Sequence, residues 1–174
     1  RGIMNGLRMP WFPVAGNHDI FWRGEGRPAT EHEANYEKHF GPLWYWFEHK
    51  KCGFLVLFSD EGDPAREGEV RNFQDRTQQR FSDAQLAWLK QSLEEMKGLR
   101  HVFLFMHHPR WAPDLYPGTN WPEVHKVLVG AGNVRACFAG HIHRLRYDGV
   151  KDGIEYFALA ATGGGIPGDY PRAG

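Results

Sequence analysis

Residues 101–110, HVFLFMHHPR, contain the stretch that decides the fold. Residues 102–106 are continuously apolar, as is typical of a strand buried on both faces of a parallel sheet. Two histidines follow directly and mark the carboxyl end of that strand. We therefore expect an α/β fold with this strand in the interior of its sheet.

The residues that follow complete a βαβ unit. Asn120 and Glu123 have capping-box spacing at the start of a helix whose apolar residues share one face. Residues 134–139 form a second strand-like run, which Arg135 interrupts. Strand, helix and strand in this order predict two parallel strands joined by a helical crossover.

Towards the N-terminus, the sequence predicts a strand, a loop and a helix. The apolar run at residues 10–15, PWFPVA, predicts a strand that leads into a loop, although Pro13 is unfavourable in a strand. Thr30 and Glu33 have capping-box spacing, and Gly41-Pro42 is expected to end the helix that they begin.

Two pairs of short strands are also predicted. Residues 44–47 and 54–58 are read as a hairpin joined around residues 50–53. The last two strands are expected around residues 145–147 and 155–160, before a glycine run. We find no internal repeat and no second domain.

The clearest predicted helix spans residues 81–96. Ser82 caps it and Gln85 completes a capping box, while Phe81 and Leu86 occupy the positions of a hydrophobic staple. Its apolar stripe consists of Leu86, Leu89, Leu93 and Met96. The polar residues 60–80 before it are expected to form an exposed loop or insertion.

Imidazole and amide side chains follow three separate predicted strands. The residues concerned are Asn17, His18, His107, His108, His141 and His143. Ligands of open α/β sheets bind outside the carboxyl ends of the strands, so we expect the three loops to converge. In an extended segment, residues two apart point to the same side, so His141 and His143 are expected to face one pocket.

The segment Gly16-Asn17-His18-Asp19 combines three chemical functions. The amide oxygen of Asn17 can bind a cation, and His18 can donate a proton to a bound group. Asp19 can orient that imidazole and raise its basicity. Gly-Asn is also a routine turn dipeptide, and the turn is compatible with the ligand role.

Three blocks of sequence together resemble the calcineurin-like metallophosphoesterase superfamily. They are Gly16-Asn17-His18-Asp19, Met106-His107-His108-Pro109 and Gly140-His141-Ile142-His143. The family carries such blocks in this order, each after a strand. Phe40-Gly41-Pro42 before an aromatic hairpin, and Phe81-Ser82 opening a helix with Trp88-Leu89, resemble the cyclic-nucleotide-phosphodiesterase and purple-acid-phosphatase-like branches.

The resemblance implies a dinuclear metal site and hydrolysis of phosphate mono- or diesters by a metal-bound hydroxide. It implies that Asn17, His107 and His141 ligate one metal ion and that His143 ligates the other. It also implies that His18 protonates the leaving alkoxide. Ligands of mixed type suit Mn, Fe or Zn.

Two further residues of the loop after the apolar strand are predicted to contact a small phosphoester substrate. The first is His108, beside the expected ligand His107. The second is Arg110, which can frame a substrate cleft together with the aromatic residues Trp111, Tyr116 and Trp121. Asp19 is assigned to catalysis beside His18, since it can orient the catalytic imidazole.

The family's Asp-x-His and Gly-Asp-x-x-Asp blocks are absent, and the sequence before Asn17 is too short to hold them. In the family, these blocks supply most ligands of one metal and the aspartate that bridges both. We therefore expect residues 1–174 to be the later part of a single four-layer α-β-β-α sandwich domain that lacks its N-terminal strand-helix units.

Composition excludes some classes of protein. The 174 residues have zero formal net charge, which argues against a broad nucleic-acid-binding surface. No run of about 18 apolar residues predicts a membrane span. Cys52 and Cys137 are predicted to be buried free thiols, with one disulfide as the alternative. The chain opens at Arg1 without a signal peptide, so cytoplasmic and exported locations both stay open.

Two other functions are compatible with the same residues. The first is a non-catalytic binding or scaffold protein that keeps the fold, which the retained ligands disfavour. The second is a nuclease, which the neutral charge and the lack of a basic run disfavour.

Overall fold

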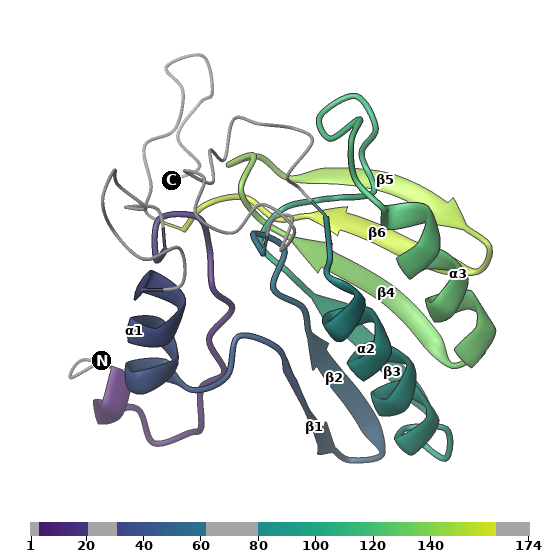
Figure 1. The fold of residues 1–174 in the computed structure, drawn as a ribbon. Helices are drawn as coiled ribbons and strands as arrows, with labels where there is room; N and C mark the ends of the chain where they lie inside the picture. Colours follow the sequence, from purple (N-terminus) through teal and green to yellow (C-terminus); the bar gives the residue numbers. More distant parts are fainter. Residues whose placement is uncertain (1–3, 21–30, 62–79, 163–174) are drawn as a thin grey trace.

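The computed structural model describes residues 4–20, 31–61 and 80–162, and a six-stranded sheet lies at its centre (Figure 1). The strand order is β1-β2-β3-β4-β6-β5. The strands are β1 (Tyr45–His49), β2 (Cys52–Val56), β3 (His101–Phe105), β4 (Val134–Ala139), β5 (Arg146–Lys151) and β6 (Ile154–Ala158). β2, β3, β4 and β6 run parallel, and β1 and β5 pair antiparallel at the two edges.

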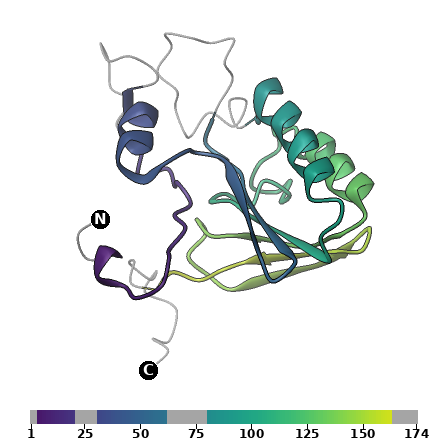
Figure 2. The ribbon, with the colours of Figure 1, turned by 90° about the horizontal axis from the view of Figure 1, so that it is seen from below.

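Two helical crossovers cover one face of the sheet. Helix α2 (Asp83–Glu95) joins β2 to β3, and helix α3 (Trp121–Ala131) joins β3 to β4. Because both crossovers link neighbouring parallel strands in the same direction across the sheet, their helices lie side by side on one face (Figures 1 and 2). The predicted βαβ unit is confirmed, and a second one precedes it.

The main core lies between these helices and the sheet. Leu86, Leu89, Leu93 and Met96 of the predicted helical stripe all belong to it. In β3, Val102 and Leu104 are fully buried beneath the helices, whereas Phe103 and Phe105 on the opposite face are only half-buried. The expectation that this strand is buried on both faces is therefore wrong for the described part of the chain.

The face of the sheet opposite the helices carries a row of stacked rings. We call it the aromatic row, and it consists of Phe12, Phe47, Phe54, Phe103, Phe105, Phe138, Phe157 and Tyr147. Successive ring centroids lie between 3.6 Å and 6.3 Å apart, so the row crosses all six strands. Cross-strand register explains it, because Phe105 lies opposite Phe138 and Phe138 opposite Phe157.

The strand expected at residues 10–15 does not form. This segment follows the edge strand β1 through side chains, with the Tyr45 hydroxyl donating to the Pro13 carbonyl at 2.8 Å and Phe12 stacked on Phe47. Pro10 and Pro13 have no N–H to donate to a ladder, which is why an apolar run here gives an extended segment rather than a strand.

The helix starts are only partly as predicted. Ser82 caps α2 by accepting from the Gln85 backbone, but the Gln85 side chain bonds to Phe58 instead of returning to Ser82. Glu61 takes that place and accepts from the Ser82 N–H at 2.8 Å and from its hydroxyl at 2.7 Å. Asn120 makes no side-chain cap on α3, because its amide bonds both backbone groups of Phe81.

The remaining elements follow the sequence closely. The β1–β2 hairpin turns at Lys50 and Lys51, both with positive φ. Helix α1 (Glu31–Phe40) ends at Gly41, whose φ of 98° suits glycine. The short helix η1 is Met4–Gly6. The predicted cap at Thr30, most of the polar residues 60–80 and the glycine run lie outside the described residues.

The structure also bears on the two cysteines and on the question of a membrane span. Cys52 and Cys137 are both free thiols, half-buried and buried respectively. Within residues 4–20, 31–61 and 80–162, no helix combines the length and apolar character that a membrane crossing requires.

Candidate metal centre

The loop that carries Asn17 is held by a small second core. Ala15 and Ile20, on either side of the loop, are buried with Tyr36, Leu43 and Phe58. The Asp19 carboxylate accepts from the Gly16 N–H at 2.8 Å, and the Asp19 N–H donates to the Gly16 carbonyl at 3.0 Å. These bonds close a tight turn, and the Asn17 side chain between them is buried.

Two histidines reach the same place from the ends of parallel strands. His107 follows β3, and His141 follows β4 after Gly140. The Gly140 N–H donates to the His107 carbonyl at 2.9 Å, which extends the pairing of the two strands into their loops. The backbone of His141 has a φ of 63°, a conformation that costs a non-glycine residue free energy and is found mainly at functional sites.

Three potential ligand atoms converge between these loops. The Asn17 Oδ1 lies 2.7 Å from the His107 Nε2 and 3.2 Å from the His141 Nδ1. The two imidazole nitrogens lie 3.2 Å from each other. The three atoms come from residues up to 124 positions apart in the sequence, so only the fold brings them together.

This set of atoms fits one transition-metal ion. Nitrogen and oxygen ligands bind such ions at about 2.0–2.2 Å, so two ligands of one ion lie roughly 3 Å apart. An amide oxygen with two imidazoles is a ligand set that Mn, Fe and Zn all accept. The separations of 2.7–3.2 Å are thus those expected of neighbouring ligands of a single ion.

The surroundings keep both imidazoles neutral and able to bind a cation. Burial, followed by the neighbouring His141, lowers the pKa of His107 to about 3. Burial, followed by the Arg110 guanidinium, lowers the pKa of His141 to about 4. A neutral imidazole offers a nitrogen lone pair to a metal, whereas a protonated one does not.

His108 lies beside this set in a different role. One nitrogen atom of each of His107, His108 and His141 falls within 4.8 Å of the other two, so His108 is a geometrically possible ligand. However, its Nδ1 lies 3.1 Å from the Ser59 Oγ, and its backbone N–H donates to the same oxygen. The potential ligand atoms of Asn17, His107 and His141 lie within 3.2 Å of one another, whereas Ser59 bonds His108 on one side.

Arg110 is almost completely buried next to the histidines. Its Nε and Nη2 donate to the Ser59 carbonyl, and its guanidinium lies 4.6 Å from the centre of the Tyr116 ring. Nη2 also lies 4.0 Å from the Asp60 carboxylate. Burial lowers the pKa of Arg110 to about 10, which still leaves it charged at neutral pH.

The other predicted residues lie at the open side of the centre. His18, Asp19 and His143 are exposed. His143 has a φ of 55°, and with the left-handed His141 this shows that residues 141–143 are not extended, so the predicted two-residue alternation is wrong there. His18 and His143 both lie close enough to act on the charges of His107 and His141.

Sequence reasoning missed Ser59 and Asp60. Ser59 and Asp60 follow β2 at the same edge of the sheet as His107, so the rule that ligands bind at strand ends would have found them. Tyr116 lies 5.9 Å from the His108 ring and 6.4 Å from the His141 ring, measured between ring centres. Tyr116 is one of the aromatic residues that the sequence analysis named as possible parts of a substrate cleft.

A family model and two relatives of known name resemble this chain in sequence. The family model for calcineurin-like phosphoesterases matches residues 2–145. The chain is 25% identical to rabbit (Oryctolagus cuniculus) tartrate-resistant acid phosphatase type 5 over 163 residues, covering 88% of this chain and 49% of that protein. It is 26% identical to a protein of Fibrobacter succinogenes named "Probable cyclic nucleotide phosphodiesterase" over 148 residues, 82% of this chain and 49% of that protein.

Solved structures share the fold. A dimetal phosphatase from Danio rerio superimposes with a TM-score of 0.55 at 22% identity, covering 68% of this chain and 49% of that one. A purple acid phosphatase from yellow lupin (Lupinus luteus) seeds gives a TM-score of 0.55 at 12% identity, covering 83% of this chain and 30% of that one. The chain therefore spans about half the length, or less, of the relatives that it matches.

Proposed function

Because the chain belongs to the calcineurin-like phosphoesterase family, we propose that it carries part of a dinuclear metal site that hydrolyses small phosphate mono- or diesters. The observation that supports this most directly is the convergence of Asn17 Oδ1, His107 Nε2 and His141 Nδ1 within 3.2 Å. Hydrogen bonds from the two imidazoles would be enough to satisfy the Asn17 amide oxygen. Three ligand-type atoms that surround one point are, however, also the arrangement that binds a cation.

In this proposal, Asn17, His107 and His141 hold one ion and His143 is a ligand of the second. Two bound cations neutralise the phosphate oxygens and lower the pKa of water, which is the chemistry that a poor, anionic electrophile requires. Mn, Fe and Zn all suit the ligands present. The chain's own contribution is to hold neutral imidazoles in place, through burial and through the paired loops after β3 and β4.

His18 is proposed as the general acid. Hydrolysis breaks the bond between phosphorus and the ester oxygen, and the departing alkoxide needs a proton. His18 is exposed beside the ligands, where it can meet a substrate from the solvent side. Asp19 holds the turn that presents His18, through the bond from the Gly16 N–H to its carboxylate.

His108 and Arg110 are proposed to support the substrate side of the centre. Both are buried and bonded to Ser59, so they offer fixed positions rather than mobile contacts. The Arg110 Nη1 is buried and has no hydrogen-bond partner among the described residues. Its positive charge next to the histidines favours the binding of an anionic ester by long-range attraction.

We also propose that the carboxylate ligands of the second ion come from sequence outside residues 1–174, as part of a second sheet. The half-buried aromatic row supports this proposal, because it offers an apolar face opposite the helices. Two packed sheets flanked by helices would complete the four-layer α-β-β-α sandwich expected from the sequence.

The decisive experiment uses the natural full-length chain, purified without chelator. Elemental analysis is expected to find two transition-metal ions per chain. Turnover of 4-nitrophenyl phosphate or bis(4-nitrophenyl) phosphate is expected with added Mn²⁺, and is expected to fall by at least roughly 1,000-fold in His107→Ala, given how strongly such sites depend on their ions. Absence of turnover with Mn, Fe and Zn and both esters would refute a hydrolytic function.

A further inference from the structure

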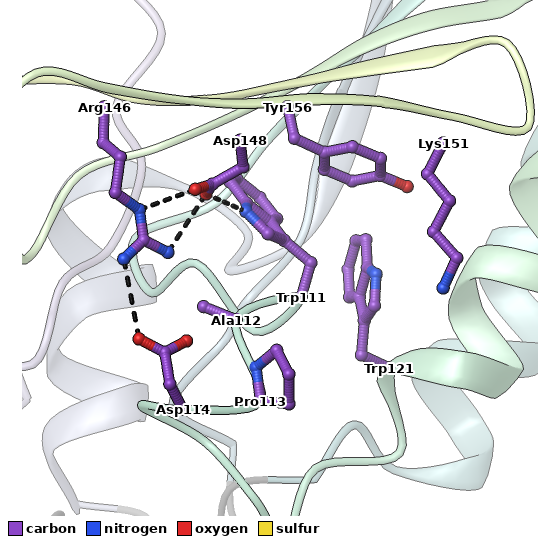
Figure 3. A pocket seen from close by; sticks show the side chains of 9 residues that line it. All are labelled: Trp111, Ala112, Pro113, Asp114, Trp121, Arg146, Asp148, Lys151 and Tyr156. Carbon is purple, nitrogen blue, oxygen red and sulfur yellow. Dashed lines mark hydrogen bonds and ion pairs between the residues drawn. The ribbon is translucent and has the colours of Figure 1, made fainter.

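A pocket lies on the face of the sheet that α3 covers, and part of its lining comes from the loop that follows His108. The pocket has a volume of about 250 Å³ and lies between residues 111–114, the first residue of α3 and the hairpin of β5 and β6 (Figure 3). A cavity of about 150 Å³ holds one benzene molecule, whereas whole drug-sized ligands need about 300–1,000 Å³. The pocket therefore suits one ring system of a larger ligand.

One wall of this pocket is aromatic. The ring centres of Trp111 and Tyr156 lie 5.0 Å apart, those of Trp111 and Trp121 5.8 Å, and those of Trp121 and Tyr156 6.2 Å. Rings at these separations contact one another, so nothing fits between them and they form a continuous surface. Trp111 is the most exposed of the three. A flat ring gains most from such a surface, by offset or edge-to-face contact.

The charges around the pocket balance. Arg146 makes an ion pair with Asp148 at 2.7 Å and lies 3.7 Å from Asp114. The Trp111 indole N–H donates to Asp148 at 2.7 Å, which fixes the ring beside this pair (Figure 3). Lys151 is the remaining charged residue of the lining. Because each carboxylate faces the arginine, the pocket favours a ring without a net charge over an anion.

The same loop lines the pocket and the metal centre. Trp111 comes three residues after His108, and Arg146 three residues after His143. Tyr116 belongs to this loop, and its ring lies 5.9 Å from that of His108. Burial raises the pKa of Tyr116 to about 12, and Arg110 and Arg146 both act against that rise, so Tyr116 lies near arginines of both sites. The loop of residues 108–116 thus contributes side chains to both the metal centre and the pocket.

We propose that this pocket binds an uncharged aromatic ring of the phosphoester substrate while the phosphate lies at the metal centre. The proposal rests on the phosphoesterase function and adds a substrate class, namely esters of alcohols that carry a flat ring. Trp111 is the ring of the aromatic wall that a ligand can reach, since Trp121 is only 4% and Tyr156 only 3% exposed. The arginine–aspartate pair fixes Trp111 in position.

The test compares benzyl, cyclohexylmethyl and methyl phosphate on the metal-loaded natural full-length chain. All three are esters of alcohols of similar acidity, so their leaving groups have similar reactivity. Differences in kcat/KM therefore measure the effect of the ring on binding and turnover. We expect benzyl phosphate to exceed methyl phosphate by roughly tenfold or more, from burial of a ring. We expect it to exceed cyclohexylmethyl phosphate by about three- to tenfold, from aromatic contact.

Variants show whether the pocket causes this preference. Trp111→Leu is expected to reduce the advantage of benzyl over cyclohexylmethyl phosphate to within about twofold. Trp88→Leu is the matched control, because Trp88 is also half-buried against the main core but does not line the pocket. Equal kcat/KM for the three esters, or a benzyl preference that survives Trp111→Leu, would overturn the proposal.

A binding measurement separates this proposal from the function on which it rests. If none of the esters is hydrolysed, calorimetric titration with benzylphosphonate and methylphosphonate still tests the pocket. Tighter binding of benzylphosphonate that Trp111→Leu abolishes would retain the pocket as a ring site, although the hydrolytic function had failed. Equal affinities for the two phosphonates would reject the pocket as well.

Discussion

At the scale of single residues, the metal centre depends on close approach between chain segments. Gly16 lies directly against the His107 ring, since a Cβ at this position would come within 3.0 Å of the His107 Cε1 and Nδ1. The glycine of the Gly-Asn-His-Asp block therefore has a steric role besides its part in the turn. A larger residue here would push the His107 ring away from its place beside Asn17.

Gly16→Ala is expected to weaken metal binding by roughly 10- to 100-fold, the range found when the support of a metal ligand is lost. The added methyl group displaces the His107 ring. The affinity can be measured by competition with a chromophoric chelator on the natural full-length chain. Gly98→Ala is the control, because nothing lies within 4 Å of a Cβ at Gly98. Equal affinities of the two variants would contradict the steric role.

His141→Ala removes a proposed ligand and is expected to lower the affinity for one of the two ions by at least roughly 100-fold, beyond the effect of losing a supporting residue. Elemental analysis after dialysis should then find one ion per chain instead of two. His49→Ala, a change at an exposed histidine at the end of β1, should keep both. A His141→Ala chain with both ions still bound would remove His141 from the ligand set.

At the scale of elements, polar side chains at the helix starts serve tertiary contacts. The Asn120 amide joins the start of α3 to Phe81 at 2.9 Å in both directions. The Gln85 side chain bonds both backbone groups of Phe58, just beyond β2. Both residues lie where a local cap was expected. Each instead links a helix start to a segment distant in the sequence, so the segments at Phe58 and Phe81 are fixed to the helices.

Ser82→Ala is expected to lower the free energy of unfolding by about 1–2 kcal/mol, the upper range for loss of an N-cap. The serine hydroxyl accepts from the Gln85 N–H and also donates to Glu61, so both bonds are lost together. Urea denaturation of the natural full-length chain measures the change. Ser82→Thr keeps the hydroxyl and should retain most of the stability. An equal loss in both variants would assign the effect to packing rather than capping.

At the scale of the whole molecule, the two faces of the sheet differ. Helices α2 and α3 lie together on one side of the sheet (Figure 2), and the face beneath them is a closed core. On the other face, the rings of the aromatic row are half-buried or, at Phe12 and Tyr147, exposed within the described residues. Stacked phenylalanine rings across six strands form a large apolar surface, and such surfaces on soluble domains mark places where other structure binds. This asymmetry agrees with a chain that spans about half the length of its curated relatives.

Hydroxyl-radical footprinting of the natural full-length chain tests whether a second sheet covers the aromatic row. We expect Phe54, Phe105 and Phe138 to be oxidised several-fold more slowly than Phe40, which is 38% exposed on α1. The physical reason is exclusion of water between packed sheets. Oxidation of the row at the rate of Phe40 would show that no second sheet covers it.

The sequence by itself determined the parallel βαβ core and indicated the candidate metal ligands. The apolar run at residues 102–106 and the helical stripe at residues 86–96 predicted their elements, because burial imposes a period that local sequence displays. Histidines directly after strands were assigned to one sheet edge, because parallel strands end on the same side. Among them, Asn17, His107 and His141 have ligand-type atoms within 3.2 Å of one another.

Only the tertiary structure decided which interactions these residues make. The run at residues 10–15 forms no strand, because a strand requires a partner with which its N–H groups can pair. Glu61 rather than Gln85 completes the cap of α2, and His141 adopts a left-handed backbone that no local pattern predicts. Local sequence specifies periodicity and residue type, whereas the choice of partner depends on segments far apart in the chain, which meet only after folding.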